Sequence, residues 1–267
     1  MDNTYRPSLT VRARRAVVLA SAMLLLTGCI GQAPSPSSTY TDESGQTVVA
    51  DWMDYPAHAG TDGDVLLDAP DQTQLEQPAR ELIEQIRTAV EKESGIALSP
   101  SEPEQSWFDA DDWYPHTGNG YGGDSMLITV NCCELQSDDV PPRARWGDLI
   151  VAANRAAVDA GLGSFVLDRD AMGSEYRDKY CNRPGGECWS VSATVYDGYQ
   201  WVYLTIQDAS LDPSGNAAKE AEDVGWPTAS IAIGYGATVV RAGESAAYAQ
   251  AMEPFLGLER PDGTTSD

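Results

Sequence analysis

Residues 189–207 read WSVSATVYDGYQWVYLTIQ, and they carry the clearest local structural pattern in the chain. Residues typical of strands flank Asp197-Gly198, a dipeptide that favours a two-residue hairpin turn. The pattern predicts a β-hairpin with one aliphatic face, which is suited to packing on helices, and one polar and aromatic face. With Asp197 and Gly198 at the turn, the predicted cross-strand pairs are Ala193 with Val202 and Val191 with Leu204 on the aliphatic face, and Thr194 with Trp201 and Ser192 with Tyr203 on the other.

Two helices are predicted outside the hairpin. Apolar residues recur at helical spacing over residues 75–90 and 146–160, and Gly95 and Gly161 follow as C-terminal stops. Two helices and several strands in this order favour an α+β two-layer sandwich, with both helices packed on one face of a mainly antiparallel sheet. Besides the hairpin, strands are predicted at residues 126–132, 164–167 and 231–240.

The start of the chain has the layout of an export signal. Arginines precede an uncharged apolar run over residues 16–28, which is shorter than the roughly 20 residues that a membrane-spanning helix needs. The run ends in Leu26-Thr27-Gly28-Cys29, which looks like the lipobox of bacterial lipoproteins, where diacylglycerol is attached to the cysteine thiol. We therefore expect cleavage before Cys29, and a lipid anchor on Cys29 that holds the protein at the extracytoplasmic face of the cell membrane.

The rest of the chain is long enough for one domain. Pro- and Ser-rich sequence after Cys29 cannot form a core, so residues 29–70 are predicted to be the lipid anchor and a flexible tether. A single α+β domain is expected over residues 71–256, and a disordered tail over residues 257–267.

The mature chain is strongly acidic. Removal of the first 28 residues takes away four of the 17 basic and one of the 41 acidic side chains, which leaves a formal net charge of −27. A field of this sign repels nucleic acid and anionic head groups, so nucleic acid is not expected as a partner. The ordinary consequence of such a charge is solubility.

Apart from Cys29, the chain contains four cysteines: Cys132, Cys133, Cys181 and Cys188. An even number in an exported chain predicts two disulfides. Because neighbours in sequence pair poorly, we expect Cys132 and Cys133 each to bond one of the other two, in either arrangement. On the predicted strand, Cys132 faces inward and Cys133 outward. A zinc site is disfavoured because the adjacent cysteines lack the usual spacing.

Residues 107–124 read WFDADDWYPHTGNGYGGD and are the segment densest in reactive and aromatic groups. In one interpretation, Trp107 and Phe108 dock into the core and the Gly-rich part is a mobile loop. In another, the segment is a surface for a neutral ligand or an envelope protein, with aromatic platforms and hydrogen-bonding groups. The candidate residues of that surface are Trp107, Asp109, Asp111, Asp112, Trp113, Tyr114, His116 and Tyr121.

Two other interpretations of this segment are weaker. Its aspartates offer ligands for calcium, but the order of residues departs from the EF-hand pattern. Its glycines precede a strand rather than a helix, which disfavours a phosphate cradle. We therefore expect neither a metal nor a cofactor.

Catalytic signatures are scarce. The chain has two histidines, His58 and His116, and no Gly-x-Ser-x-Gly elbow. His116 beside Asp111 and Asp112 is a conceivable general base, but a lone loop histidine is more often polar surface. We assign no catalytic residue.

The order of lipobox, helix, Trp-plus-acidic loop, strand, Ala-rich helix and hairpin resembles the LppA-type lipoproteins of actinobacteria. The resemblance lies in Trp107-Phe108-Asp109 with Asp111-Asp112, in Ala152-Ala153-Asn154, and in the hairpin around residues 196–203. That family has no established activity, so the resemblance implies a location and a fold rather than a chemistry. The adjacent pair Cys132-Cys133 does not match the family's pattern.

The sequence thus predicts a membrane-anchored, non-catalytic envelope lipoprotein that binds a ligand or a partner. Two alternatives remain. One is a hydrolase that acts on cell-surface polymers, for which the acidic and aromatic segment 107–124 is the motivation. The other is a binding domain stabilised by calcium.

Overall fold

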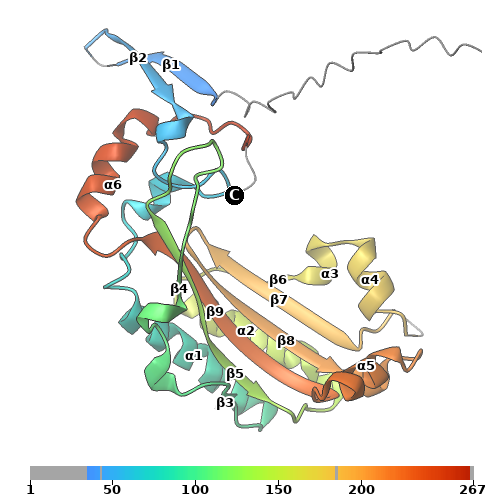
Figure 1. Ribbon diagram of the computed structural model, residues 1–267. Coiled ribbons are helices and arrows are strands. Elements are labelled where there is room, and N and C mark those ends of the chain that lie inside the picture. Colours follow the sequence, from blue (N-terminus) through green and yellow to red (C-terminus); the bar gives the residue numbers. More distant parts are fainter. Residues whose placement is uncertain (1–34, 43, 184–185, 265–267) are drawn as a thin grey trace, which may run out of the picture. The chain divides into compact units, whose positions relative to one another are not determined.

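The structure, a computed structural model, describes residues 35–42, 44–183 and 186–264 (Figure 1). The predicted export signal and Cys29 lie outside these residues. Within the described part of the chain, no helix combines the length and the apolar character that crossing a membrane requires.

Most of the strands within the described residues join one antiparallel sheet in the order β3-β5-β9-β8-β7-β6, and β4 pairs with β5 beside β3. Helices α1 (Glu76–Ser94) and α2 (Trp146–Asp159) lie together on one face of this sheet, which confirms the predicted α+β sandwich (Figure 1). The strands are β3 (Ser99–Pro100), β4 (Trp113–Pro115), β5 (Leu127–Ser137), β6 (Val166–Leu167), β7 (Ser190–Asp197), β8 (Gln200–Asp208) and β9 (Ala229–Val240).

Both helices follow the predicted pattern. Helix α1 (Glu76–Ser94) buries its aliphatic stripe and ends at Gly95, whose φ of 74° is the left-handed conformation of a helix C-cap. Helix α2 (Trp146–Asp159) buries Trp146 and Leu149 together with small alanines, which let it pack closely beside α1. Gly161 follows α2 with a φ of 86°, as its predicted role requires.

The hairpin forms, but two residues away from the predicted register. Asp197 pairs with Gln200, so the turn consists of Gly198 and Tyr199 rather than of Asp197 and Gly198. Gly198 has a φ of 59° at the first central position, which is the type II′ pattern. A shift of two residues leaves every side chain on its predicted face. The observed pairs are Ala193 with Leu204 and Val195 with Val202 on the helix side, and Thr194 with Tyr203 and Tyr196 with Trp201 on the other.

Ordered structure begins before the predicted domain boundary at residue 71. Strands β1 (Ser37–Thr41) and β2 (Thr47–Asp51) form a separate hairpin. After it, Trp52 and Tyr55 are buried in a second apolar cluster, so this part of the expected tether belongs to the folded domain. The expected disordered tail is also packed within the described residues, because the Tyr121 hydroxyl donates a hydrogen bond to the carbonyl of Pro261.

Four further α-helices and several short 3-10 helices lie in the described part of the chain. Helix α6 contributes to the second apolar cluster through Tyr248 and Met252, and α3 contacts β7. The bounds of these helices are α3 (Asp168–Ala171), α4 (Ser174–Tyr180), α5 (Asn216–Val224) and α6 (Ser245–Met252).

Candidate functional site

The face of the sheet opposite α1 and α2 is the candidate binding surface. Over residues 191–196 of β7 and 201–206 of β8, the residues that point toward the helices are buried, whereas the alternate residues remain partly or fully exposed. We call this second side the outer face. On β7 and β8 it consists of Ser192, Thr194, Tyr196, Trp201, Tyr203 and Thr205.

Three aromatic side chains on the outer face form an aromatic ledge, which we define as Tyr196, Trp201 and Tyr203. The Trp201 and Tyr203 rings lie on Gly236 and Gly234 of β9, where a β-carbon would come within 2.2 Å of each ring. Tyr196 stacks beside Trp201 with ring centroids 6.2 Å apart and an interplanar angle of 21°. The glycines therefore let two rings lie flat on the sheet, and Tyr196 extends the surface.

Hydroxyl groups also lie on this face. Ser192 Oγ and Thr205 Oγ1 are 3.0 Å apart across β7 and β8, and Thr129 Oγ1 and Thr238 Oγ1 are 2.7 Å apart across β5 and β9. His116 Nε2 lies 2.8 Å from Thr129 Oγ1. Of the candidate residues predicted in segment 107–124, His116 is thus hydrogen-bonded to a hydroxyl of the outer face.

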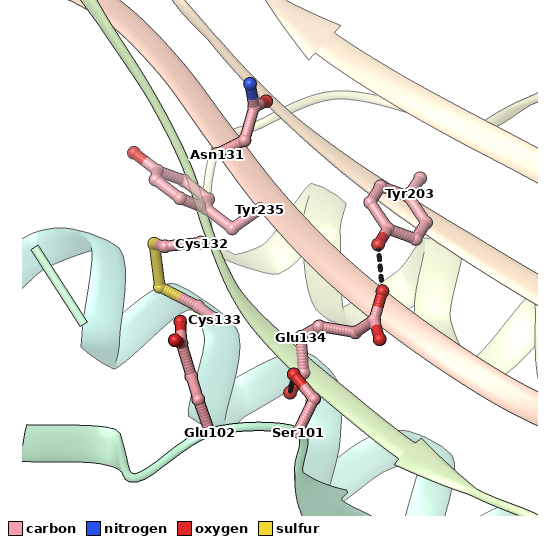
Figure 2. Close-up of a pocket in the computed structure, with 8 residues that line it drawn as sticks. All are labelled: Ser101, Glu102, Asn131, Cys132, Cys133, Glu134, Tyr203 and Tyr235. Atoms are coloured by element: carbon pink, nitrogen blue, oxygen red, sulfur yellow. Dashed lines mark hydrogen bonds between the residues drawn. A yellow bond between two sulfur atoms is a disulfide. The ribbon is translucent and has the colours of Figure 1, made fainter. Parts of the chain in front are cut away.

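A pocket of about 340 Å³ lies beside the ledge (Figure 2). Tyr203 belongs to both features, since its ring is part of the ledge and its hydroxyl donates a 2.8 Å hydrogen bond to the Glu134 carboxylate. Burial raises the pKa of Tyr203 above its usual range, and the neighbouring Glu134 raises it further. The residues that line the pocket are Ser101, Glu102, Asn131, Cys132, Cys133, Glu134, Tyr203 and Tyr235.

The disulfide pairing differs from the expectation. Cys132 bonds its neighbour Cys133, and Cys181 bonds Cys188. The sheet register slips between Cys132 and Leu135, and Cys133 adopts a φ of 65°, so this bulge departs from the regular alternation that the prediction assumed. Both adjacent cysteines are buried, so the expectation that Cys133 faces outward was also wrong.

Segment 107–124 lies mostly against the core. Trp107, Trp113 and Tyr121 are buried, and the Arg80 guanidinium lies 5.3 Å from the centre of the Trp107 ring. Tyr114 is 59% exposed, so of the four aromatic candidates in the segment only this ring is exposed. Its other candidates lie toward solvent: Asp109 and Asp111 are exposed, and Asp112 is partly exposed.

Asn119, which is completely buried, fixes the Gly-rich part of this segment to residues 52–55. We call this set of hydrogen bonds the clamp. The Asn119 side-chain nitrogen lies 2.8–3.1 Å from the carbonyl oxygens of Trp52, Met53 and Tyr55, which share its two N–H donors. Its oxygen accepts hydrogen bonds from the backbone N–H groups of Tyr121 and Gly123. A β-carbon at Gly123 would lie 1.8 Å from the Met53 carbonyl oxygen, which explains the need for glycine there.

The expected mobile loop is therefore an ordered connection between residues 119–123 and 52–55. Sequence reasoning missed both Asn119 and the ledge. The ledge had a readable signal, because an aromatic-x-aromatic pattern at 201–203 pairs with Gly-x-Gly at 234–236.

Among the described residues, no group of three or more His, Cys, Asp or Glu side chains is arranged to hold a metal ion. The calcium alternative therefore gains no support from the aspartates of segment 107–124. No family model, curated protein or solved structure matches the chain.

Proposed function

We propose that this protein is a lipid-anchored, extracytoplasmic and non-catalytic binding module, and that its outer face binds a neutral, hydroxyl-rich chain such as an oligosaccharide. The observation that carries the proposal is the aromatic ledge, in which Trp201 and Tyr203 rest on glycines of a sheet face that stays partly exposed. The opposite face of the same sheet packs against α1 and α2.

The ledge has the chemistry for such a ligand. Flat aromatic rings bury the apolar C–H faces of sugar rings, and neighbouring hydroxyl groups exchange hydrogen bonds with sugar hydroxyls. Because the glycines let the rings of Trp201 and Tyr203 lie close against the sheet, these side chains lose little conformational freedom on binding. The formal charge of −27 on the mature chain favours a neutral ligand over an anionic one.

The proposed location rests on the export signal and the lipobox that the sequence predicts. The lipobox at residues 26–29 supports anchoring through Cys29, and two disulfides are consistent with an oxidising compartment. The resemblance to LppA-type lipoproteins points to the same location. Mass spectrometry of the protein from its native membrane tests this part. An acylated N-terminal Cys29 is the expected result, and a mature chain that retains residues 1–28 would refute the anchor.

Calorimetric titration of the mature chain in detergent with neutral tetrasaccharides of different linkage tests the binding. At least one should bind with a Kd below about 1 mM, equivalent to about −4 kcal/mol. Trp201→Ala should weaken that binding by about tenfold or more, as should Tyr196→Ala, which removes an exposed ring. The matched control is Trp226→Ala, because Trp226 is 71% exposed outside the ledge.

Three results would contradict the proposed binding. One is the absence of binding by every tetrasaccharide. Another is equal affinity in the Trp201 and Trp226 variants. The third is self-association of the wild-type protein that Trp201→Ala abolishes, which would assign the outer face to a second copy of the chain.

A further inference from the structure

The bulge in β5 lies at the two contacts that position the ledge residue Tyr203. Cys133 and Glu134 together oppose a single residue of β9, Gly234, because the register slips there. The Tyr203 ring lies on that glycine, where a β-carbon would come within 2.2 Å of the ring. The Tyr203 hydroxyl donates a 2.8 Å hydrogen bond to the Glu134 carboxylate, as the dashed line in Figure 2 shows. The position of Tyr203 therefore depends on the shape of the bulge.

The Cys132–Cys133 disulfide restrains the backbone of this bulge. Cys133 has a φ of 65°, a left-handed conformation that is disfavoured for residues with a β-carbon. Bulges whose first residue is left-handed normally have glycine there, and Cys133 takes that place. The bond to the adjacent Cys132 closes a small ring that includes their peptide bond, and such a ring restricts the backbone at both cysteines.

This disulfide is poorly suited to stabilising the whole fold. A disulfide stabilises mainly by closing a loop in the unfolded chain, and a bond between neighbours closes almost none. Its reduction would also leave the sheet register in place, because a slip of one residue would turn the buried Leu135 to the outer face. Reduction therefore changes the bulge and leaves the domain folded.

We propose that the Cys132–Cys133 bond is a redox-sensitive switch for the ledge, which a dithiol opens and a disulfide partner closes. In the closed form, the bulge keeps Tyr203 in place and the outer face binds its ligand. In the open form, Cys133 leaves the left-handed conformation and Tyr203 loses its contact with Glu134. The inference rests on the proposed function, because the ledge is the site that the switch regulates. The oxidising compartment expected for the chain makes the closed form the resting state.

Access to the bond comes from the pocket of about 340 Å³, which both cysteines line. Cys132 is 9% exposed and Cys133 is completely buried, so a thiolate of the dithiol attacks the Cys132 sulfur. The S–S bond breaks, a mixed disulfide forms at Cys132, and Cys133 leaves as a thiolate and takes up a proton. The second thiol of the reagent then attacks the first, and Cys132 is released and takes up another proton. Two electrons and two protons pass to the cysteines, and the dithiol becomes a disulfide.

The first measurement is the order in which the two disulfides open. The mature wild-type chain in detergent is equilibrated with graded dithiothreitol, the free thiols are alkylated, and mass spectrometry follows each bond. The Cys132–Cys133 bond should open at about tenfold less dithiothreitol than the Cys181–Cys188 bond, because a bond that stabilises the fold less is easier to reduce. Earlier opening of the Cys181–Cys188 bond would overturn the inference.

The second measurement follows the Tyr203 ring by NMR in the ligand-free chain, at the dithiothreitol concentration that opens only the Cys132–Cys133 bond. The Tyr203 ring signals, assigned with Tyr203→Phe, should shift, whereas those of Tyr248 in the second apolar cluster should not. Tyr203 signals that stay in place, or a general loss of dispersed signals, would overturn the switch.

Two double variants that lack the bond carry opposite expectations. In Cys132→Ser/Cys133→Ser, serine is disfavoured at a positive φ just as cysteine is, so the Tyr203 signals should match those of the reduced wild type. In Cys132→Ser/Cys133→Gly, glycine adopts the left-handed conformation without a disulfide, so the signals should match those of the oxidised wild type. Neither variant should respond to dithiothreitol. The same Tyr203 signals in both variants would refute the role of the bond in shaping the bulge.

The affinity for the best-binding tetrasaccharide tests the link to the ledge. Opening the bond in the wild type should weaken binding about fivefold, the contribution of a typical hydrogen bond, and the Ser/Ser variant should be equally weak. The Ser/Gly variant should bind as the oxidised wild type does. An unchanged affinity despite shifted Tyr203 signals would overturn the regulation of binding. If no tetrasaccharide binds, the proposed function fails, whereas the order of reduction and the Tyr203 signals still decide whether the bond is a switch.

Discussion

The indole of Trp201 lies so close to Gly236 on the neighbouring strand that a β-carbon there would come within 2.2 Å of the ring. The two residues are paired in the sheet register, and Tyr203 is paired with Gly234 in the same way. Glycine inside a strand normally weakens it, but an aromatic partner across the ladder covers the exposed backbone. The ledge therefore depends on β9 as much as on β8.

Replacing Gly236 by alanine should displace the Trp201 ring, because the added β-carbon has no room. We expect a loss of about 1–3 kcal/mol in the free energy of unfolding from the forced movement, together with loss of oligosaccharide binding. Gly147→Ala is the matched control, since nothing lies within 4 Å of its β-carbon position in α2. That variant should be neutral or more stable by up to about 1 kcal/mol. Urea denaturation measures the free energy of unfolding of both variants. Equal values for the two would contradict the close contact between Trp201 and Gly236.

The two disulfides should differ in their effect on stability. In Cys132→Ala/Cys133→Ala, reduction of the remaining Cys181–Cys188 bond should lower the free energy of unfolding by about 2 kcal/mol, because it opens a short loop. In Cys181→Ala/Cys188→Ala, reduction of the Cys132–Cys133 bond should lower it by less than about 1 kcal/mol. Denaturation of each variant with and without reductant measures both effects. The reverse order would show that the adjacent bond is a structural cross-link.

Asn119→Asp tests the clamp. A carboxylate still accepts the hydrogen bonds from Tyr121 and Gly123, but it cannot donate to the carbonyls of residues 52, 53 and 55. Leaving these buried acceptors unpaired should cost about 3 kcal/mol. Asn131→Asp, at an exposed position, should cost less than about 0.5 kcal/mol. Chemical denaturation compares the two, and similar costs would disprove the role of Asn119.

Asp212 should contribute to stability above acid pH. Hydrogen bonds from the Ser214 hydroxyl and the Ala217 N–H, in the first turn of α5, lower the pKa of Asp212 from 3.8 to about 2. A depressed pKa means that this contribution is complete above pH 3.8 and is lost as the pH falls toward about 2. Asp212→Asn should therefore cost about 1 kcal/mol at neutral pH, and the difference from the wild type should shrink over that acid range. A difference in the free energy of unfolding between Asp212→Asn and the wild type that stays constant with pH would contradict this role of Asp212.

Sequence patterning predicted the parts of the fold that local periodicity determines. Helices α1 and α2 end at the glycines expected to stop them, Gly95 and Gly161. The two faces of the β7–β8 hairpin were also predicted correctly despite a register error, because a slip of two residues preserves sidedness. The polar and aromatic face that the sequence predicted for the hairpin is the face that carries the ledge.

The remaining features depend on contacts between distant residues or on an irregular backbone. The pairing of Cys132 with Cys133 requires the bulge and the positive φ at Cys133, which an alternating strand pattern does not show. The order upstream of residue 71 depends on Trp52 and Tyr55 meeting Tyr121 and Phe255, far along the chain. The aromatic residues of segment 107–124 were compatible with either a binding surface or docking into the core, and the burial of Trp107, Trp113 and Tyr121 favours the core.

Binding at the outer face can be observed at Trp201 itself. The experiment is an NMR titration of the mature chain with its best-binding tetrasaccharide, in which the indole N–H signal of Trp201 is followed. We expect a saturable shift of this signal, and no shift for Trp146, which is the first residue of α2 and is buried on the opposite side of the sheet. A saturable shift of other indole signals, with the Trp201 signal unmoved, would place the ligand elsewhere and contradict binding at the outer face.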